Sequence, residues 1–375
     1  MSEPVAITGW AFASPFGTDE ASFWEGLCHG APPLSTWRSE PMFPGLECGA
    51  AQLPGPAGSP ADRVRALATD LARRALAHAG HAAPPAGLGM GLGSYWGEID
   101  YLALPPRPAP PPLLPLLARD LGLSGPTANL PVACASGNYA LAWAAARIRR
   151  QDAPVMLAGG LDVIGPAAVG GYIFLDNLCA ALPLPFSPDR DGFLLSEGGA
   201  LFVLEPRDAA RAAGRPIRAV LRGYGNAHDA SHPTRPDPAG GGLVRAMRQA
   251  LARAGLGPAD IGYVNAHAPG TIQNDPGEAA ALREVFGPAG VPVSSTKAVL
   301  GHAQGGANAL EALACILALQ RGLAPPTRSV AAADPALELD VILGAPREFS
   351  PPRALSLASS LGGATSAVIL ERGAQ

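Results

Sequence analysis

The sequence has little of several features that mark particular classes of protein. Its five cysteines lie far apart among 375 residues and form no C-x-x-C pair, which argues against a disulfide framework and favours a reducing compartment. The net charge of −4 provides no basic field for nucleic acid or anionic lipid. We see no signal peptide at the N-terminus and no run of about 18 apolar residues that predicts a membrane span. We therefore expect a soluble, cytoplasmic protein.

Short apolar runs alternate with longer segments whose apolar residues lie three and four positions apart, which predicts an α/β protein. Strands are expected over 4–10, 87–93, 128–133, 154–163, 198–206, 217–225, 261–267, 291–296, 339–344, 354–361 and 366–371. Helices are expected over 61–79, 136–150, 241–254, 276–286 and 304–321. The strands form two sets, which indicates a loose duplication with a joint near 207–216. The proline-rich segment 104–115 indicates an extended connection.

One cysteine stands where a strand is expected to meet a helix. In "NLPVACASGNYAL", Cys134 follows an apolar run that ends at Val132 and Ala133 and precedes a helix that begins near Ser136. The N–H groups and the dipole of a helix start stabilise a thiolate and lower the pKa of the thiol. A buried structural cysteine fits the same local pattern. On this segment alone, both interpretations stay open.

Two later segments have a histidine beside glycines. His267 follows an expected strand, and His302 precedes an alanine-rich helix. Asp275 and Glu278 begin a helix, where capping of free N–H groups explains both acids. Lys297 lies among small residues at the end of a strand, where it is either solvated or paired with a carboxylate. Each of these residues therefore also has a purely structural interpretation.

Two further patterns have features of binding sites. The turn in "SSLGGATSAVIL" (359–370) offers N–H groups to an oxyanion, although the same pattern is also typical of an ordinary hairpin. His228 and His232 have the spacing of a metal-binding pair, but they stand in a loop without a third ligand, so we predict no metal site.

The order of these motifs along the chain is more specific than any one of them. A cysteine at a strand–helix elbow is followed by "NAH", by "SSTKAVLGH" and by a late "GG" turn. This order resembles the elongating type of β-ketoacyl-[acyl carrier protein] synthase, and the similarity extends from "VAITGWAFASPFGTDEASFWEGL" to the C-terminal strand. The resemblance implies a thiolase-like α/β fold in five αβαβα layers, with similar halves at 1–215 and 216–375. It also implies a dimer, either with itself or with a second ketosynthase-like subunit.

The resemblance further implies a decarboxylative Claisen condensation. Cys134 takes an acyl group from the phosphopantetheine of an acyl carrier protein. The N–H groups of Cys134 and Leu361 form an oxyanion hole, in a turn that Gly362 and Gly363 complete. Because the substrates arrive on the carrier protein, neither a metal nor a resident cofactor is implied.

The same resemblance assigns the second-half residues to the condensation step. His267 and His302 hold the thioester carbonyl of a malonyl unit while CO2 leaves. Lys297, paired with Glu278, orients the histidines, and Asp275 is a further supporting acid. Candidate residues for docking the carrier protein are Arg63, Arg65 and the arginines of 147–150.

The sequence departs from the family's pattern at several loops. Residues 268–271 read Ala-Pro-Gly-Thr in place of Gly-Thr-Ser-Thr, and Ser360-Leu361 replaces a Gly-Phe pair whose aromatic ring covers the cysteine. Bulky residues at 172–178 stand where the family often has Gly-Ala-Ala. These departures favour a specialised, polyketide-like pathway over housekeeping fatty acid synthesis. Two alternatives stay open: an enzyme that only transfers acyl groups or only decarboxylates, and a chain-length-factor-like structural subunit.

Overall fold

The computed structural model describes residues 4–39, 45–54, 58–95 and 112–373. Its main sheet contains β1 Val5–Ala13, β4 Leu88–Gly93, β5 Thr127–Asn129, β6 Val155–Asp162, β8 Gly198–Pro206, β9 Ala219–His228, β10 Tyr263–Asn265, β11 Pro292–Ser294, β13 Asp340–Val341, β15 Arg353–Ser359 and β16 Ala364–Arg372. Shorter strands outside it are β2 Ser35–Arg38, β3 Glu47–Ala51, β7 Leu195–Ser196, β12 Leu323–Ala324 and β14 Arg347–Glu348. The helices are α1 Glu20–His29, α2 Pro60–His78, α3 Leu113–Leu121, α4 Ser136–Arg149, α5 Pro166–Phe174, α6 Arg207–Ala212, α7 Gly241–Ala254, α8 Asn274–Phe286, α9 Lys297–Leu300 and α10 Ala307–Arg321.

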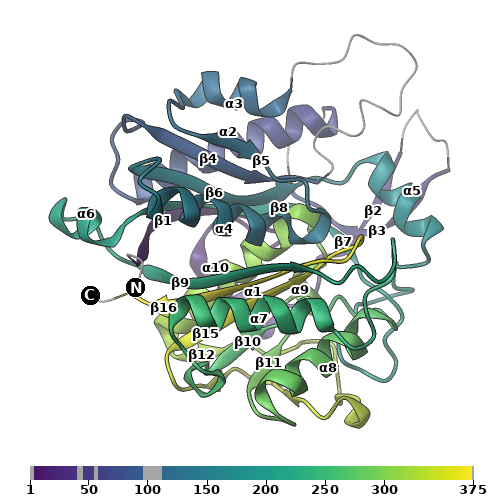
Figure 1. The fold of residues 1–375 in the computed structure, drawn as a ribbon. Coiled ribbons are helices and arrows are strands. Elements are labelled where there is room, and N and C mark those ends of the chain that lie inside the picture. The colour runs from purple at the N-terminus through teal and green to yellow at the C-terminus, as the bar shows by residue number, and fades with distance from the viewer. Residues whose placement is uncertain (1–3, 40–44, 55–57, 96–111, 374–375) are drawn as a thin grey trace.

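The main sheet consists of two halves with the same order of strands (Figure 1). The first half has the order β5-β4-β6-β8-β1, and the second has β11-β10-β15-β16-β9, with β13 added at its edge. If the five strands of each half are numbered 1 to 5 in the order in which they occur along the chain, both halves have the spatial order 3-2-4-5-1. Both halves also share one pattern of parallel and antiparallel pairs. The duplication that the sequence indicated is therefore present in the topology, and antiparallel pairing of β1 with β9 joins the halves.

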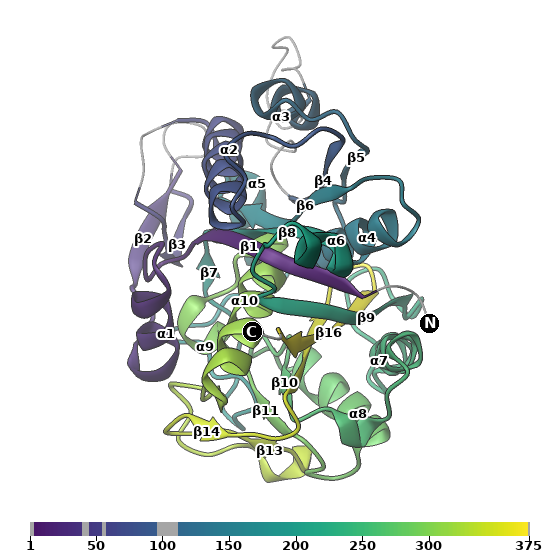
Figure 2. The same ribbon diagram turned by 90° about the vertical axis from the view of Figure 1, so that its left-hand side faces the viewer.

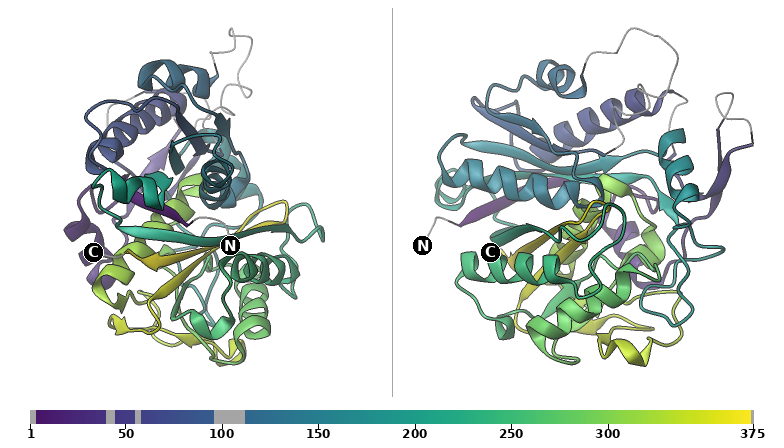
Figure 3. Two further views of the ribbon diagram at one scale, coloured as in Figure 1. Left: turned by 60° about the vertical axis from the view of Figure 1, so that its left-hand side comes forward. Right: turned by 45° about the vertical axis from the view of Figure 1, so that its right-hand side comes forward.

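The helices lie in three layers that alternate with the two halves of the sheet (Figures 1 and 2). Helices α2 and α3 cover the outer face of the first half, and α7 and α8 cover the outer face of the second. Helices α4 and α10 lie between the halves, and Figure 3 shows the two outer layers on opposite sides of the molecule. This arrangement confirms the predicted αβαβα layers.

The central helices determine where the two halves of a site can meet. Every residue of α10 from Ala307 to Leu319 is buried, as expected for a helix that is apolar on all sides. Helix α4 crosses it closely because Gly137 has no side chain: a Cβ there would lie 2.9 Å from the nitrogen of Ala309. The N-termini of α4 and α10, and the turns before them, are therefore close in space.

Several local expectations were wrong. The strand expected over 128–133 ends at Asn129, because the chain turns before the cysteine. Residues 113–115 of the expected extended connection begin helix α3, whose buried leucines pack on α2; residues 104–111 lie outside the described part of the chain. Helices α1, α5 and α6 had not been predicted.

Candidate active site

Cys134 lies in a tight turn between β5 and α4. Residues Ala133–Ala135 form a single 3-10 turn, and Ala133 has a φ of +47°, which is a strained backbone conformation for a residue with a side chain. The hydroxyl of Ser136 holds this turn: it donates to the carbonyl of Ala133 (2.6 Å) and accepts from the N–H of Val132 (2.9 Å). The turn presents Cys134 at the start of α4, as the sequence predicted.

The surroundings of the thiol differ from the expectation. Its side chain is nearly buried, and this burial raises the pKa of Cys134 to about 11. Three groups oppose that effect: the hydroxyl of Tyr172, the charge of Lys297 and the N–H of Leu361. The predicted lowering of the pKa was wrong, because loss of water around the sulfur outweighs the donors that face it.

The N–H of Leu361 reaches Cys134 from a hairpin turn between β15 and β16. The N–H of Ser360 donates to the carbonyl of Ala364 (3.0 Å), and the N–H of Gly363 donates to the carbonyl of Ser360 (3.0 Å). Gly362 and Gly363 have φ values of +83° and +84°, which favour glycine. The segment is an ordinary hairpin that also places one N–H at the thiol.

His267 follows β10 in a buried loop that two carboxylates hold. Glu278 accepts from the N–H groups of His267 and Ala268, both at 2.7 Å. Asp275 accepts from the N–H groups of Phe186 (2.9 Å) and Gly270 (3.2 Å). Neither acid caps its own helix α8, so that expectation was wrong: both bind backbone that comes from elsewhere. Burial raises the pKa of Glu278 to about 7 and that of Asp275 to about 6.

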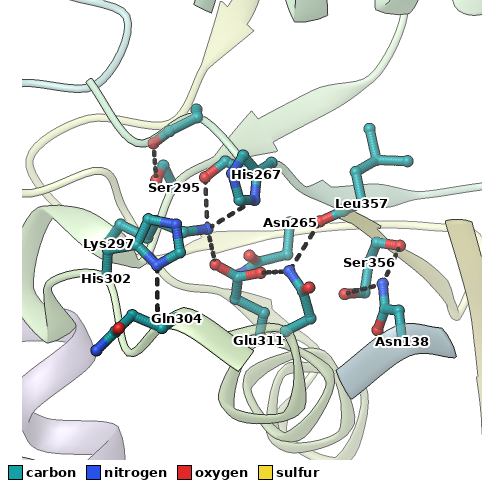
Figure 4. Close-up of polar contacts among 12 residues, drawn as sticks. Asn138, Asn265, His267, Ser295, Lys297, His302, Gln304, Glu311, Ser356 and Leu357 are labelled. Atoms are coloured by element: carbon teal, nitrogen blue, oxygen red, sulfur yellow. Dashed lines mark hydrogen bonds and ion pairs between the residues drawn. The ribbon is translucent and has the colours of Figure 1, made fainter. Parts of the chain in front are cut away.

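Lys297 is the only lysine in the chain, and its partner differs from the predicted one. Its ammonium forms a buried ion pair with Glu311 of α10, not with Glu278 (Figure 4). It also donates to the carbonyl of His267 (2.6 Å) and lies 3.3 Å from its Nδ1 atom. The predicted pairing with Glu278 was wrong because that carboxylate is occupied by backbone N–H groups.

The environments of the two histidines determine which ring nitrogen carries the proton. The Nδ1 atom of His302 accepts from the N–H of Gln304 (3.0 Å), and the ammonium of Lys297 faces the Nδ1 atom of His267. Burial and the charge of Lys297 hold the pKa of both imidazoles well below the usual range. Both rings are therefore neutral, and both carry the proton on Nε2.

One pocket brings these groups together. Cys134, His267, His302 and Leu361 line it, together with Tyr172 and Phe193. The rings of His267 and His302 meet edge to face with their centroids 5.4 Å apart. A reacting carbonyl in this pocket would therefore face a thiol, a backbone N–H and two imidazole N–H groups, which is an arrangement suited to acyl transfer and enolate stabilisation.

Sequence reasoning had missed two residues of the site. Glu311 is the one acid in the buried stretch of α10, which is otherwise apolar except for Asn308, and this isolation was a usable signal because a buried acid needs a partner. Tyr172 places its hydroxyl 3.9 Å from the Sγ atom of Cys134. It had been noted only as part of a bulky segment, since nothing local predicts that α5 meets the turn at Cys134.

The arginines considered for carrier-protein docking form contacts within the chain. Arg63 binds the buried Glu197 with both terminal nitrogens, at 2.7 and 2.6 Å. Arg65 pairs with Asp120, Arg147 pairs with Asp152, and Arg149 donates to the carbonyl of Arg222. Part of their charge is therefore used for internal contacts.

The described residues contain neither a cluster of metal ligands nor a helix that could span a membrane. No three His, Cys, Asp or Glu side chains in this part of the chain are grouped closely enough to hold a metal ion. No helix in it combines the length and the apolar character needed to cross a membrane.

Known proteins resemble the chain over almost its whole length. Nodulation protein E of Rhizobium leguminosarum bv. trifolii is 35% identical, with 99% of this chain and 100% of that protein aligned. The 3-oxoacyl-[acyl-carrier-protein] synthase 2 of Coxiella burnetii is 31% identical, with 98% of each chain aligned. The tetracenomycin polyketide synthase ketoacyl synthase alpha subunit of Streptomyces glaucescens is 32% identical, with 98% and 97% aligned.

Solved structures agree with this relationship. The ishigamide ketosynthase/chain length factor superposes with a TM-score of 0.87 at 28% identity, over 99% of this chain and 100% of that one. The family models for the N-terminal and C-terminal domains of beta-ketoacyl synthase match residues 116–210 and 218–331. The chain therefore belongs to the β-ketoacyl synthase family, on the evidence of its sequence, its fold and its pocket.

Proposed function

We propose that the chain is a cytoplasmic ketosynthase that condenses an acyl group on Cys134 with a malonyl unit, in specialised, polyketide-like biosynthesis. The observation that carries the proposal is the single pocket that joins Cys134 of the first half to His267 and His302 of the second. Relatives with polyketide names and the altered loops at 268–271 and 360–361 favour the specialised pathway.

The first step transfers the acyl group to Cys134. As the bond between Sγ and the acyl carbon forms, the thioester bond to the donor breaks, and the thiol proton ends on the departing thiol. The carbonyl oxygen becomes negative in this step, and the N–H groups of Cys134 and Leu361 are its donors. Loss of one such donor typically costs about 10²–10³ in rate.

The second step uses the two histidines. The Nε2–H groups of His267 and His302 hold the malonyl thioester oxygen while the bond to the carboxylate breaks and CO2 leaves. The enolate carbon attacks the acyl carbonyl on Cys134, and the sulfur departs as a thiolate that takes up a proton from water. Because neutral imidazoles supply both donors, the step as proposed requires no metal or organic cofactor. Lys297 and Glu311 keep His267 in its donating tautomer.

The substrates are proposed to arrive on an acyl carrier protein. One similar structure is described as a type II PKS acyl-carrier protein in complex with its ketosynthase, and it aligns with 99% of this chain at 25% identity and a TM-score of 0.89. Another is a ketosynthase/chain length factor. We propose a dimer, either of this chain or with a second ketosynthase-like subunit.

The test follows the acyl group by mass. The protein is incubated with acyl- and malonyl-carrier-protein thioesters, alone and with a co-expressed partner subunit. The Cys134 adduct and the condensed product are measured by intact-mass analysis. The C134S variant should form no adduct, whereas H267A and H302A should acylate but release CO2 at least about 10²-fold more slowly.

Each other outcome indicates a different function. An adduct without condensation in the wild-type protein indicates an acyltransferase. Release of CO2 without condensation indicates a decarboxylase. Absence of any Cys134 adduct under all conditions refutes the nucleophile and leaves the chain-length-factor-like structural role.

A further inference from the structure

Tyr172 occupies a position at the thiol that the reaction described above does not use. It lies on α5, its side chain is buried, and its hydroxyl oxygen is 3.9 Å from Cys134 Sγ. The ring meets Phe193 edge to face at a centroid distance of 5.0 Å, and Phe193 in turn packs on His302 at 4.9 Å. Leu361 packs against the same apolar cluster. The ring therefore packs between the thiol and Phe193, which in turn contacts His302.

We propose that Tyr172 is a further catalytic residue, whose hydroxyl donates a hydrogen bond to the Cys134 thiolate before acyl transfer. The inference rests on the proposed function, in which Cys134 is the nucleophile. A buried anion needs donors because it has lost its water, and hydrogen bonds to charged acceptors are the stronger ones. Among the described residues the N–H of Leu361 also faces this sulfur, and in the proposed reaction it donates to the substrate oxyanion as the acyl group is transferred.

Other charged and titratable groups also act on the sulfur. Lys297 from α9 favours the thiolate, and the buried Asp162 from β6 opposes it. Tyr95 interacts with the cysteine from the end of β4, while His267 and His302 line the same pocket as neutral rings. Among these groups Tyr172 is the hydroxyl within hydrogen-bonding distance of Sγ. Replacing it with phenylalanine removes the donor without changing any charge or the ring.

The hydroxyl acts only before the covalent step. When Sγ of the thiolate bonds to the acyl carbon, the donor's thioester bond breaks, and the departing sulfur takes up a proton from water that replaces the one Cys134 released on ionising. The sulfur then carries no charge and is a weak acceptor. Tyr172 therefore accelerates the attack of the thiolate and does not hold the acyl-enzyme.

The test compares the wild-type protein with Y172F and the control Y139F. Tyr139 is also partly buried, but its hydroxyl donates to the carbonyl of Ala227. Alkylation of Cys134 by iodoacetamide is measured from pH 7 to 9.5 with peptide-resolved mass spectrometry, which separates it from the four other cysteines. A donor worth one pKa unit changes the thiolate fraction tenfold, and the compensating change in nucleophilicity leaves about threefold in rate.

We expect Y172F to alkylate about threefold more slowly than wild type at each pH, and to lose a similar factor in acyl transfer from the carrier protein. Y139F should stay within about 1.5-fold of wild type. A Y172F profile that coincides with wild type, in a protein of unchanged near-UV circular dichroism, overturns the proposal. If wild type forms no acyl adduct, the proposed function fails, while the alkylation comparison still tests the hydroxyl.

Discussion

Replacing Lys297 with methionine tests the buried ion pair beneath the histidines. Methionine keeps most of the volume of the side chain but removes the ammonium. Glu311, itself buried, then keeps one neutral donor, the Nδ2 atom of Asn308 at 2.7 Å. The carbonyl of His267 loses its 2.6 Å donor, and Nδ1 of the same ring loses the ammonium. The change therefore affects both the stability of the protein and the tautomer of the ring.

The expected loss of stability is large. Removal of one partner of a buried ion pair costs about 3–5 kcal/mol, because the other charge is left uncompensated. A protein of ordinary stability has about 5–15 kcal/mol in total. The double variant K297M/E311Q removes the stranded charge and keeps an oxygen for Asn308. It should therefore recover at least about half of the lost stability.

Urea denaturation followed by circular dichroism measures the stability, and release of CO2 from malonyl-carrier protein measures the chemistry. In K297M/E311Q the ring of His267 can carry its proton on either nitrogen, so only part of the protein has the Nε2–H donor and decarboxylation should stay below the wild-type rate although the fold has recovered. The reasoning is refuted if K297M is as stable as wild type. It is also refuted if the recovered double variant decarboxylates at the wild-type rate.

Three further predictions concern the surrounding structure. Burial raises the pKa of Glu278 to about 7, above its value in the unfolded chain, so its contribution to stability falls as pH rises from about 4.5 to 7. The melting temperature of wild type minus that of E278Q should therefore decrease between pH 5 and 8. A constant difference contradicts this prediction. A Cβ at Gly160 would lie 2.1 Å from the carbonyl oxygen of Gly305, so the free energy of unfolding of G160A, measured by urea denaturation, should be lower by about 3 kcal/mol or more. A Cβ at Gly170 meets nothing within 4 Å, so the control G170A should be as stable as wild type or more stable. R63M removes the charged partner of the fully buried Glu197, which keeps, among the described residues, only the N–H groups of Leu53 and Ile164, and should cost about 3 kcal/mol. R65M, whose partner Asp120 is more exposed, should lower the melting temperature less; equal melting temperatures for the two variants would contradict the difference.

The long elements of the fold were predictable because their pattern is local. Helices α2, α4, α7, α8 and α10 begin and end within three residues of the expected positions, since their apolar residues recur at helical spacing over several turns. Helix α5 was missed because "PAAVGGYIF" has two glycines and no polar face. Its buried side, formed by Ala168, Val169 and Tyr172, packs in an apolar cluster with residues of other elements.

The sequence by itself predicted which residues carry the chemistry. Cys134, His267, Lys297 and His302 stand in an order that identified the family, and the structure places the cysteine and both histidines around one pocket. Lys297 is also the only lysine in the chain, and all the other residues counted as Lys or Arg are arginines. Such features belong to the linear sequence and need no knowledge of the fold.

Only the tertiary structure decided the partners of these residues. The family resemblance implied that Lys297 pairs with Glu278, whereas in the structure Lys297 pairs with Glu311 of α10 and Glu278 binds the N–H groups of the His267 loop. The pKa of Cys134 rose because the halves of the molecule close around it and exclude water. Both outcomes depend on contacts between segments far apart in the chain. The sequence around a residue does not show whether such contacts will bury it or which charged group they will bring to it.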